Sequence, residues 1–168
     1  GVIVVEENKP EAIAAMEKAG SGESRIKVHA VQTTYPQGGE RAIMAVVTGE
    51  YINSGMLPAD IGCIVDNVAT IYAVYEAVCK SKPLMERGFT VSGDAVKNPC
   101  NLIVRIGTQM SEVLEAAGGY KDGVEAKKLL SGGPMMGFAM ANLDAGINKN
   151  CNALTVLTED DVETAQEL

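Results

Sequence analysis

Two short stretches carry the residue types that could bind an anionic ligand. In the first, Tyr35 and Glu40 flank the paired glycines Gly38 and Gly39, just ahead of a predicted helix. Paired glycines let a backbone approach a ligand closely, because no side chain keeps the ligand away. An ordinary turn from a strand into a helix would use glycines in the same way. The pair alone therefore leaves both interpretations open.

The second stretch is Asp66-Asn67, which leads into another predicted helix. From Val68 the apolar residues recur at the spacing of one helical face: Ile71, Tyr72, Tyr75, Val78 and Cys79. Asn67 holds the N-cap position, where its side-chain oxygen can accept from first-turn amides, including that of Thr70. The free N–H groups and positive dipole end of such a helix suit an anion, most commonly a phosphate. The alternative is that Asn67 only caps the helix.

An α/β fold is expected to hold these two stretches. Residues 1–5 form a β-branched run typical of a strand covered on both faces, residues 8–20 carry helix-start signals, and residues 25–32 return to strand. Such a βαβ unit is expected to be parallel and right-handed. We also expect residues 61–65 to form a short strand ahead of the second stretch. Both stretches would then follow neighbouring strands, at the sheet edge where α/β proteins bind ligands.

The pattern changes after Pro83. It predicts strands at residues 86–92, 102–106 and 128–130, and a short helix that begins at Thr108 or Ser111. Hairpin, helix and strand in this order are typical of a small β-grasp module. The expected division is an α/β part over residues 1–83, a β-grasp part over residues 84–158 and an acidic tail over residues 159–168. Four large apolar residues near the end are expected to fill core space rather than line a ligand pocket: Met135, Met136, Phe138 and Met140.

Composition excludes several classes of partner. The net charge of -8, from 14 basic and 22 acidic residues, leaves no basic stripe for nucleic acid, and the 4% of aromatic residues offers no stacking platform. The four cysteines form no CxxC pair and the lone His29 is expected on an exposed strand face, so no metal site is predicted. Free cysteines fit a reducing, cytosolic compartment. No membrane span or signal peptide is visible. A start at Gly1, within an apolar run, suggests a fragment of a longer protein, although a processed terminus would look the same.

Four motifs in order resemble one known family, the C subunit of the Rnf ion-pumping electron-transport complex. They are YPQGGE (Tyr35–Glu40), LPADIGCIVDNVATIYAVYEAV (Leu57–Val78), SGDAVKNPCNLIVRIGT (Ser92–Thr108) and GGPMMG (Gly132–Gly137). The flavin-binding NADH dehydrogenase subunit of respiratory complex I is a more distant relative. The resemblance implies a parallel-sheet α/β part of a domain that binds FMN and NADH, followed by a β-grasp module of the SLBB type.

The resemblance also implies a partial FMN site, without catalytic residues, at seven positions: Tyr35, Gly38, Gly39, Glu40, Asp66, Asn67 and Thr70. Asn67 and Thr70 match positions near the ribityl-phosphate arm of the flavin. Two positions depart from the pattern, since Gly39 replaces an acid and Asp66 replaces an asparagine. A carboxylate at Asp66 would repel a phosphate unless it points away or meets a cation.

For the parent protein, the resemblance implies hydride transfer from NADH to FMN and release of electrons through two four-iron clusters. The flavin-wrapping glycine-rich loop would precede Gly1 and the cluster cysteines would follow Leu168, so low FMN occupancy and no activity are expected of this chain alone. The implied partners are other subunits of a membrane complex, contacted from the cytoplasmic side of the bacterial plasma membrane without insertion.

Two alternatives to this parent protein remain. One is a soluble relative, such as a microcompartment cobalamin reductase or an electron carrier for an amino-acid reductase. The other is a docking module without flavin.

Overall fold

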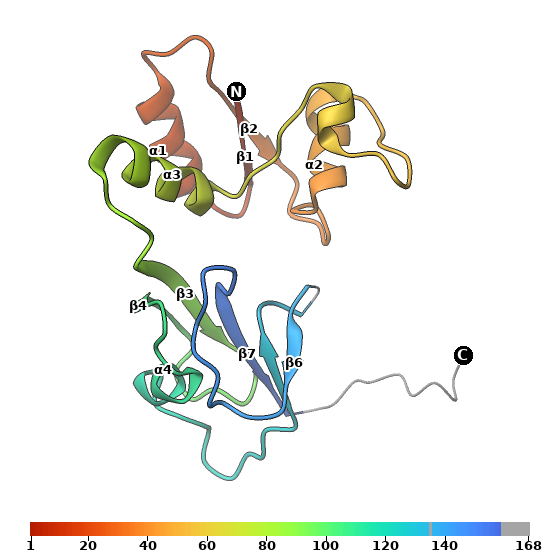
Figure 1. Ribbon diagram of the computed structural model, residues 1–168. Helices are drawn as coiled ribbons and strands as arrows, with labels where there is room; N and C mark the ends of the chain where they lie inside the picture. The colour runs from red at the N-terminus through yellow and green to blue at the C-terminus, as the bar shows by residue number, and fades with distance from the viewer. Residues whose placement is uncertain (135, 159–168) are drawn as a thin grey trace. The chain divides into compact units, whose positions relative to one another are not determined.

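The computed structural model describes residues 1–134 and 136–158 (Figure 1). The chain forms two compact units, Gly1–Asn67 and a second that begins at Val68, and each is described by itself. The acidic tail expected at residues 159–168 lies outside the described residues. The contacts group the helix after Asn67 with the second unit, and the domain boundary near Pro83 stays a prediction.

The first unit begins with the expected βαβ arrangement. Strand β1 (Val2–Glu6), helix α1 (Pro10–Gly20) and strand β2 (Lys27–Val31) follow in order, and the two strands pair in parallel from Val2 opposite Lys27 to Glu6 opposite Val31. Pro10 begins the helix, where its missing N–H costs nothing. The cap residue is Lys9, and its side chain makes no capping hydrogen bond.

Helix α2 (Glu40–Thr48) follows the paired glycines, as predicted. Gly49 ends it in the left-handed conformation, with φ of 77°, and donates its N–H to the carbonyl of Ala45 at 3.0 Å. Of the apolar residues in this helix, Met44 is fully buried and Val46 is exposed. The core of this unit is small, since its buried hydrophobic residues are Val31, Met44 and Ile52.

The prediction of a strand at residues 61–65 is wrong. A 3-10 helix, η1 (Pro58–Ile61), occupies the start of this segment, and residues 63–67 have no regular structure. The backbone bonds locally, because Asp60 accepts the N–H of Leu57 with its carboxylate at 2.8 Å. Gly62, at φ of 74°, turns the chain and donates to the carbonyl of Ala59 at 3.0 Å. In this segment, local hydrogen bonds within the turn replace the hydrogen bonds that a strand would make to a neighbouring strand.

The second unit begins with helix α3 (Val68–Lys80), which starts where the pattern predicts. None of its residues is fully buried, and the apolar face expected from the sequence is exposed in this unit. The rest of the described unit is a five-stranded sheet with one helix (Figure 1). Its elements are β3 (Glu86–Ser92), β4 (Cys100–Arg105), α4 (Met110–Ala116), β5 (Lys128–Ser131), β6 (Phe138–Met140) and β7 (Ala153–Leu157).

The sheet has the order β4-β3-β7-β5-β6, with β3 and β7 parallel and the other neighbours antiparallel. This confirms a β-grasp arrangement, in which the first and last strands lie side by side at the centre. Helix α4 buries Met110, Val113 and Leu114 in the core around Phe89 and Leu154. The two units have separate sheets.

Several details of this unit differ from the sequence prediction. Gln109, rather than Thr108 or Ser111, is the residue that precedes helix α4. Strands β6 and β7 were not predicted. Met136, in the turn before β6, is 80% exposed, and Phe138, on the edge strand β6 itself, is 78% exposed, whereas Met140 packs against the core. Met135 lies outside the described residues.

Candidate functional site

The loop ahead of helix α2 is held by its own backbone. The peptide bond between Tyr35 and Pro36 is cis. Gln37 donates its N–H to the carbonyl of Thr34 at 2.6 Å, and Gly39 donates to the carbonyl of Pro36 at 2.9 Å. These two turns deliver the chain to Gly39, the residue that precedes the helix, in an extended conformation. The loop therefore has a defined shape without help from a ligand.

The two glycines of this loop are not equivalent. A Cβ placed on Gly39 would lie 3.1 Å from the carbonyl oxygen of Pro36, which is a tight contact. A Cβ placed on Gly38 would meet nothing within 4 Å, and neither glycine has a positive φ. The first unit therefore does not require glycine at position 38. A glycine there leaves room for another molecule to approach the backbone.

Tyr35 and Glu40 lie at the two ends of this loop. The Tyr35 side chain is 73% exposed, although a tyrosine ring gains from being covered. Glu40 lies in the first turn of helix α2, where its negative charge faces the positive end of the helix dipole. Both side chains are accessible on the first unit.

The other three predicted site residues lie around the start of helix α3. Asp66 and Asn67 are the last residues of the first unit, and Asn67 directly precedes the helix as predicted. Thr70 lies in the first helical turn and belongs to the second unit. All three are exposed. Among the described residues Asp66 makes no ion pair, so no protein cation offsets its charge.

The predicted residues thus fall into two segments. Four of them share one loop-to-helix junction within the first unit, and the remaining three follow each other closely around Asn67. The two segments do not both follow strand ends as expected, since residues 63–67, directly before helix α3, form no strand. The expectation that both segments follow neighbouring strands of one sheet is therefore wrong.

The described residues hold no group of three or more His, Cys, Asp and Glu side chains that could bind a metal ion. The four cysteines are free: Cys63, Cys79, Cys100 and Cys151. Cys151 is buried, and its sulfur lies 3.0 Å from the hydroxyl oxygen of Ser131. No helix in the described part of the chain has the length and apolar character needed to cross a membrane.

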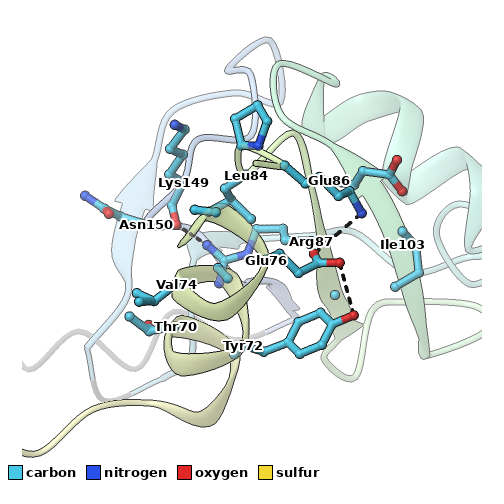
Figure 2. A pocket seen from close by; sticks show the side chains of 16 residues that line it. Thr70, Tyr72, Val74, Glu76, Leu84, Glu86, Arg87, Ile103, Lys149 and Asn150 are labelled. Atoms are coloured by element: carbon cyan, nitrogen blue, oxygen red, sulfur yellow. Dashed lines mark hydrogen bonds and ion pairs between the residues drawn. The ribbon is translucent and has the colours of Figure 1, made fainter. Parts of the chain in front are cut away.

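A second candidate site went unnoticed in the sequence. Arg87 shares one face of strand β3 with the buried residues Phe89 and Val91, and it lines a pocket beside helix α3 (Figure 2). The signal was the period-2 alternation of the strand, which places a charged residue in register with two core residues. The pocket itself had no local signal, because helix α3, strand β3 and residues 149–150 all contribute to it.

Comparisons with known proteins bear on both halves of the chain. Residues 1–76 match the Nuo51 FMN-binding domain family, and residues 89–139 match the SLBB domain family.

Three curated relatives are C subunits of ion-translocating complexes. The chain is 45% identical to the one from the proton-translocating ferredoxin:NAD(+) oxidoreductase complex of Clostridium ljungdahlii, over 97% of this chain and 35% of that protein. It is 39% identical to the one from the Na(+)-translocating complex of Acetobacterium woodii, over 98% of this chain and 37% of that protein. It is 42% identical to the one from the ion-translocating oxidoreductase complex of Pseudomonas aeruginosa, over 91% of this chain and 19% of that protein. The chain therefore spans only about a third, or less, of the length of these relatives.

Among solved structures, the chain resembles a chain of an NAD+-reducing [NiFe]-hydrogenase in the H2-reduced state. The TM-score is 0.67 at 18% identity, and the likeness covers 92% of this chain and 32% of that one. This likeness supports the α/β and β-grasp folds and, at such low identity, nothing further. Fold, family models and relatives agree with the resemblance found in the motifs, and the chain is a homologue of the C subunits of ion-translocating oxidoreductase complexes.

Proposed function

We propose that this chain supplies part of the FMN site of a subunit that passes electrons between NADH and iron–sulfur clusters. The observation that carries the proposal is the match of residues 1–76 to an FMN-binding domain family. The relatives whose names include ferredoxin and NAD(+) support the redox assignment. On this proposal, the clusters and the rest of the flavin cradle would be supplied by other parts of the subunit.

We assign the residues of both segments to one side of a flavin. The open space beside Gly38 would admit the cofactor against the loop backbone, and the exposed Tyr35 ring offers an apolar surface next to it. Asn67 and Thr70 would face the phosphate arm, at the positive end of the dipole of helix α3. When bound, FMN accepts hydride and releases single electrons, while the protein supplies binding and orientation.

Gly39, Glu40 and Asp66 would shape the site rather than hold the cofactor tightly. Gly39 fixes the start of helix α2, and the carboxylate of Glu40 lies at the positive end of that helix. Asp66 has no ion pair among the described residues, so we assign it a position turned away from the phosphate.

The partners follow from the same relationship. The relatives are named as subunits of ion-translocating complexes. We propose that the intact protein docks on the other subunits of such a complex at the cytoplasmic face of the bacterial plasma membrane. NADH would be its small-molecule substrate.

The test is a flavin titration of the intact subunit with the substitution Gly38→Val. A Cβ at this position meets nothing within 4 Å, so we expect the variant to fold and to bind FMN at least about tenfold more weakly. Gly22→Val is the matched control, because a Cβ on Gly22 also meets nothing within 4 Å in the same unit. Unchanged flavin affinity in Gly38→Val would refute the role of this loop. Absence of any flavin binding by the intact subunit would refute the whole proposal and favour a docking module.

A further inference from the structure

The second unit contains a pocket that shares only Thr70 with the flavin proposal. It has a volume of ≈ 700 Å³, which is within the size range of small-molecule sites. Helix α3 forms one wall, strands β3 and β4 form another, and residues 149–150 close one end (Figure 2). Apolar side chains line much of it, among them Val74, Leu84 and Ile103.

Arg87 reaches from strand β3 across this pocket (Figure 2). Its Nη1 donates to the backbone carbonyl of Lys149. That carbonyl belongs to a fixed turn, since the side-chain oxygen of Asn148 accepts the amides of Asn150 at 2.9 Å and Cys151 at 3.0 Å. One edge of the guanidinium is therefore anchored.

The opposite edge of the guanidinium has no acceptor. Arg87 Nε is buried and makes no hydrogen bond, and no hydrogen bond from Nη2 to a described residue is present. The Nε–H and the neighbouring Nη2 lie in one plane and form a two-donor fork that matches the two oxygens of a carboxylate or phosphate. A buried donor without a partner is costly, and native structures rarely keep one without a reason.

The nearby carboxylates do not fill this gap. Glu76 is engaged elsewhere, because one of its oxygens lies 3.2 Å from the hydroxyl of Tyr72 (Figure 2). Its carboxylate also lies 3.5 Å from Nζ of Lys82 and 4.0 Å from Nζ of Lys80. Among the described residues Arg87 makes no ion pair at all. In a chain with a net charge of -8, a half-buried arginine whose buried Nε has neither a hydrogen-bond partner nor a counter-ion among the described residues is unusual.

We infer that this pocket binds a small molecule that carries an oxyanion, a carboxylate or a phosphate, on an apolar body. The unfilled edge of Arg87 takes the oxyanion. The apolar side chains of Val74 and Ile103 contact the rest of the molecule. This site is separate from the proposed flavin residues, apart from Thr70, which lines its rim.

The experiment is a titration of the nitrogen-15-labelled chain with inorganic phosphate and, separately, with acetate, at an ionic strength held constant with chloride. The readout is the side-chain Nε–H resonance of Arg87, one of four arginines in the sequence, which is assigned from its loss in Arg87→Lys. We expect this resonance to shift saturably while those of Arg25, Arg41 and Arg105 do not. A response to phosphate alone points to a phosphorylated ligand, and a response to acetate alone to a carboxylate. If Arg87 responds no more than the other three arginines, the inference is wrong.

A matched pair of variants tests the position of the site. Val74→Glu and Val78→Glu add the same charge at exposed positions of helix α3, which are 53% and 77% exposed, but only Val74 lines the pocket. We expect Val74→Glu to weaken binding of the responding probe at least about tenfold, and Val78→Glu to leave it near the wild-type value. Arg87→Lys keeps the charge and removes the planar fork, so it should weaken binding as well, whether or not Val74→Glu folds. Equal affinity in wild type, Arg87→Lys and Val78→Glu would overturn the inference.

Discussion

The carboxylate of Asp94 accepts two hydrogen bonds from Thr158, one from the backbone N–H at 2.9 Å and one from the side-chain hydroxyl. Asp94 follows strand β3 and Thr158 follows strand β7, the two parallel strands at the centre of the sheet. The contact thus joins the ends of the two strands that define the β-grasp arrangement. These hydrogen bonds, from the hydroxyl first and the amide second, lower the pKa of Asp94 below its ordinary value.

The first prediction concerns pH. Because the folded pKa of Asp94 is depressed, its contribution to stability is present above the unfolded pKa of about 3.9 and is lost as the pH falls through the lower folded pKa. Asp94→Asn should therefore lower the melting temperature at neutral pH and make less difference in acid. Thermal unfolding of both proteins across this pH range is the measurement. Asp144→Asn removes the same charge from an exposed loop position and is the control. A deficit in Asp94→Asn that is equal at pH values above and below the transition would contradict this account.

The second prediction concerns Gly93, next to that carboxylate. Its φ is 112°, and a Cβ built on it would lie 1.9 Å from the backbone oxygen of Val156 on the central strand β7. Gly93→Ala must therefore displace backbone as well as strain it, and we expect a loss of about 3 kcal/mol or more in unfolding free energy. Gly88→Ala, within strand β3, which ends just before Gly93, has nothing within 4 Å of its Cβ and should cost far less. Denaturant unfolding of the two variants measures the difference. Similar losses of unfolding free energy in the two variants would show that the backbone of Val156 can shift to accommodate a Cβ at position 93 at little cost.

The third prediction concerns Thr155, a buried polar residue in the sheet. Its hydroxyl donates to the carbonyl of Gly132 at 2.9 Å, and its oxygen lies 3.3 Å from the hydroxyl oxygen of Ser92. Thr155→Val keeps the shape of the side chain but removes the hydrogen bond to the carbonyl of Gly132. We expect a loss of about 1–2 kcal/mol by denaturant unfolding, whereas Thr90→Val, at an exposed hydroxyl in strand β3, should cost less. No loss in Thr155→Val would mean that the carbonyl of Gly132 finds another donor.

Local sequence signals predicted the regular elements well where one signal dominated. The β-branched run of strand β1 and the proline at the start of helix α1 both lie where the sequence places them. The pattern at residues 61–65 misled because its apolar residues resemble a strand, while Pro58, Asp60 and Gly62 form a tight turn instead. In this segment, the side-chain hydrogen bond of Asp60 and the left-handed conformation of Gly62 favour a turn over the strand that the apolar residues suggest.

The two candidate sites also differ in how far local sequence reveals them. The glycine loop at residues 38–39 is visible in sequence because one short segment contains all of it. The pocket around Arg87 is not visible, since its walls come from residues as far apart as Val74 and Asn150. Only the fold brings these segments together. A charged residue in register with core residues was the one available hint.

The last prediction concerns Asn67, the residue that directly precedes helix α3. If its role is limited to capping, Asn67→Asp should be nearly neutral for stability, because Asp caps a helix as well as Asn. If the helix start faces the flavin phosphate, the same change adds a second carboxylate beside Asp66 and next to a dianion. At an effective dielectric constant of about 20, a like-charge pair near ~4 Å costs on the order of 4 kcal/mol before screening reduces it.

Even a third of that cost would weaken FMN binding by roughly tenfold in the intact subunit. The measurement is therefore paired: thermal stability of this chain and FMN affinity of the intact subunit, each with and without the substitution. Unchanged stability together with weaker flavin binding would support the site. Asn67→Ser, which keeps a capping oxygen without adding charge, is the control and should retain flavin affinity much better than Asn67→Asp. Unchanged flavin binding in Asn67→Asp would limit Asn67 to the role of a helix cap.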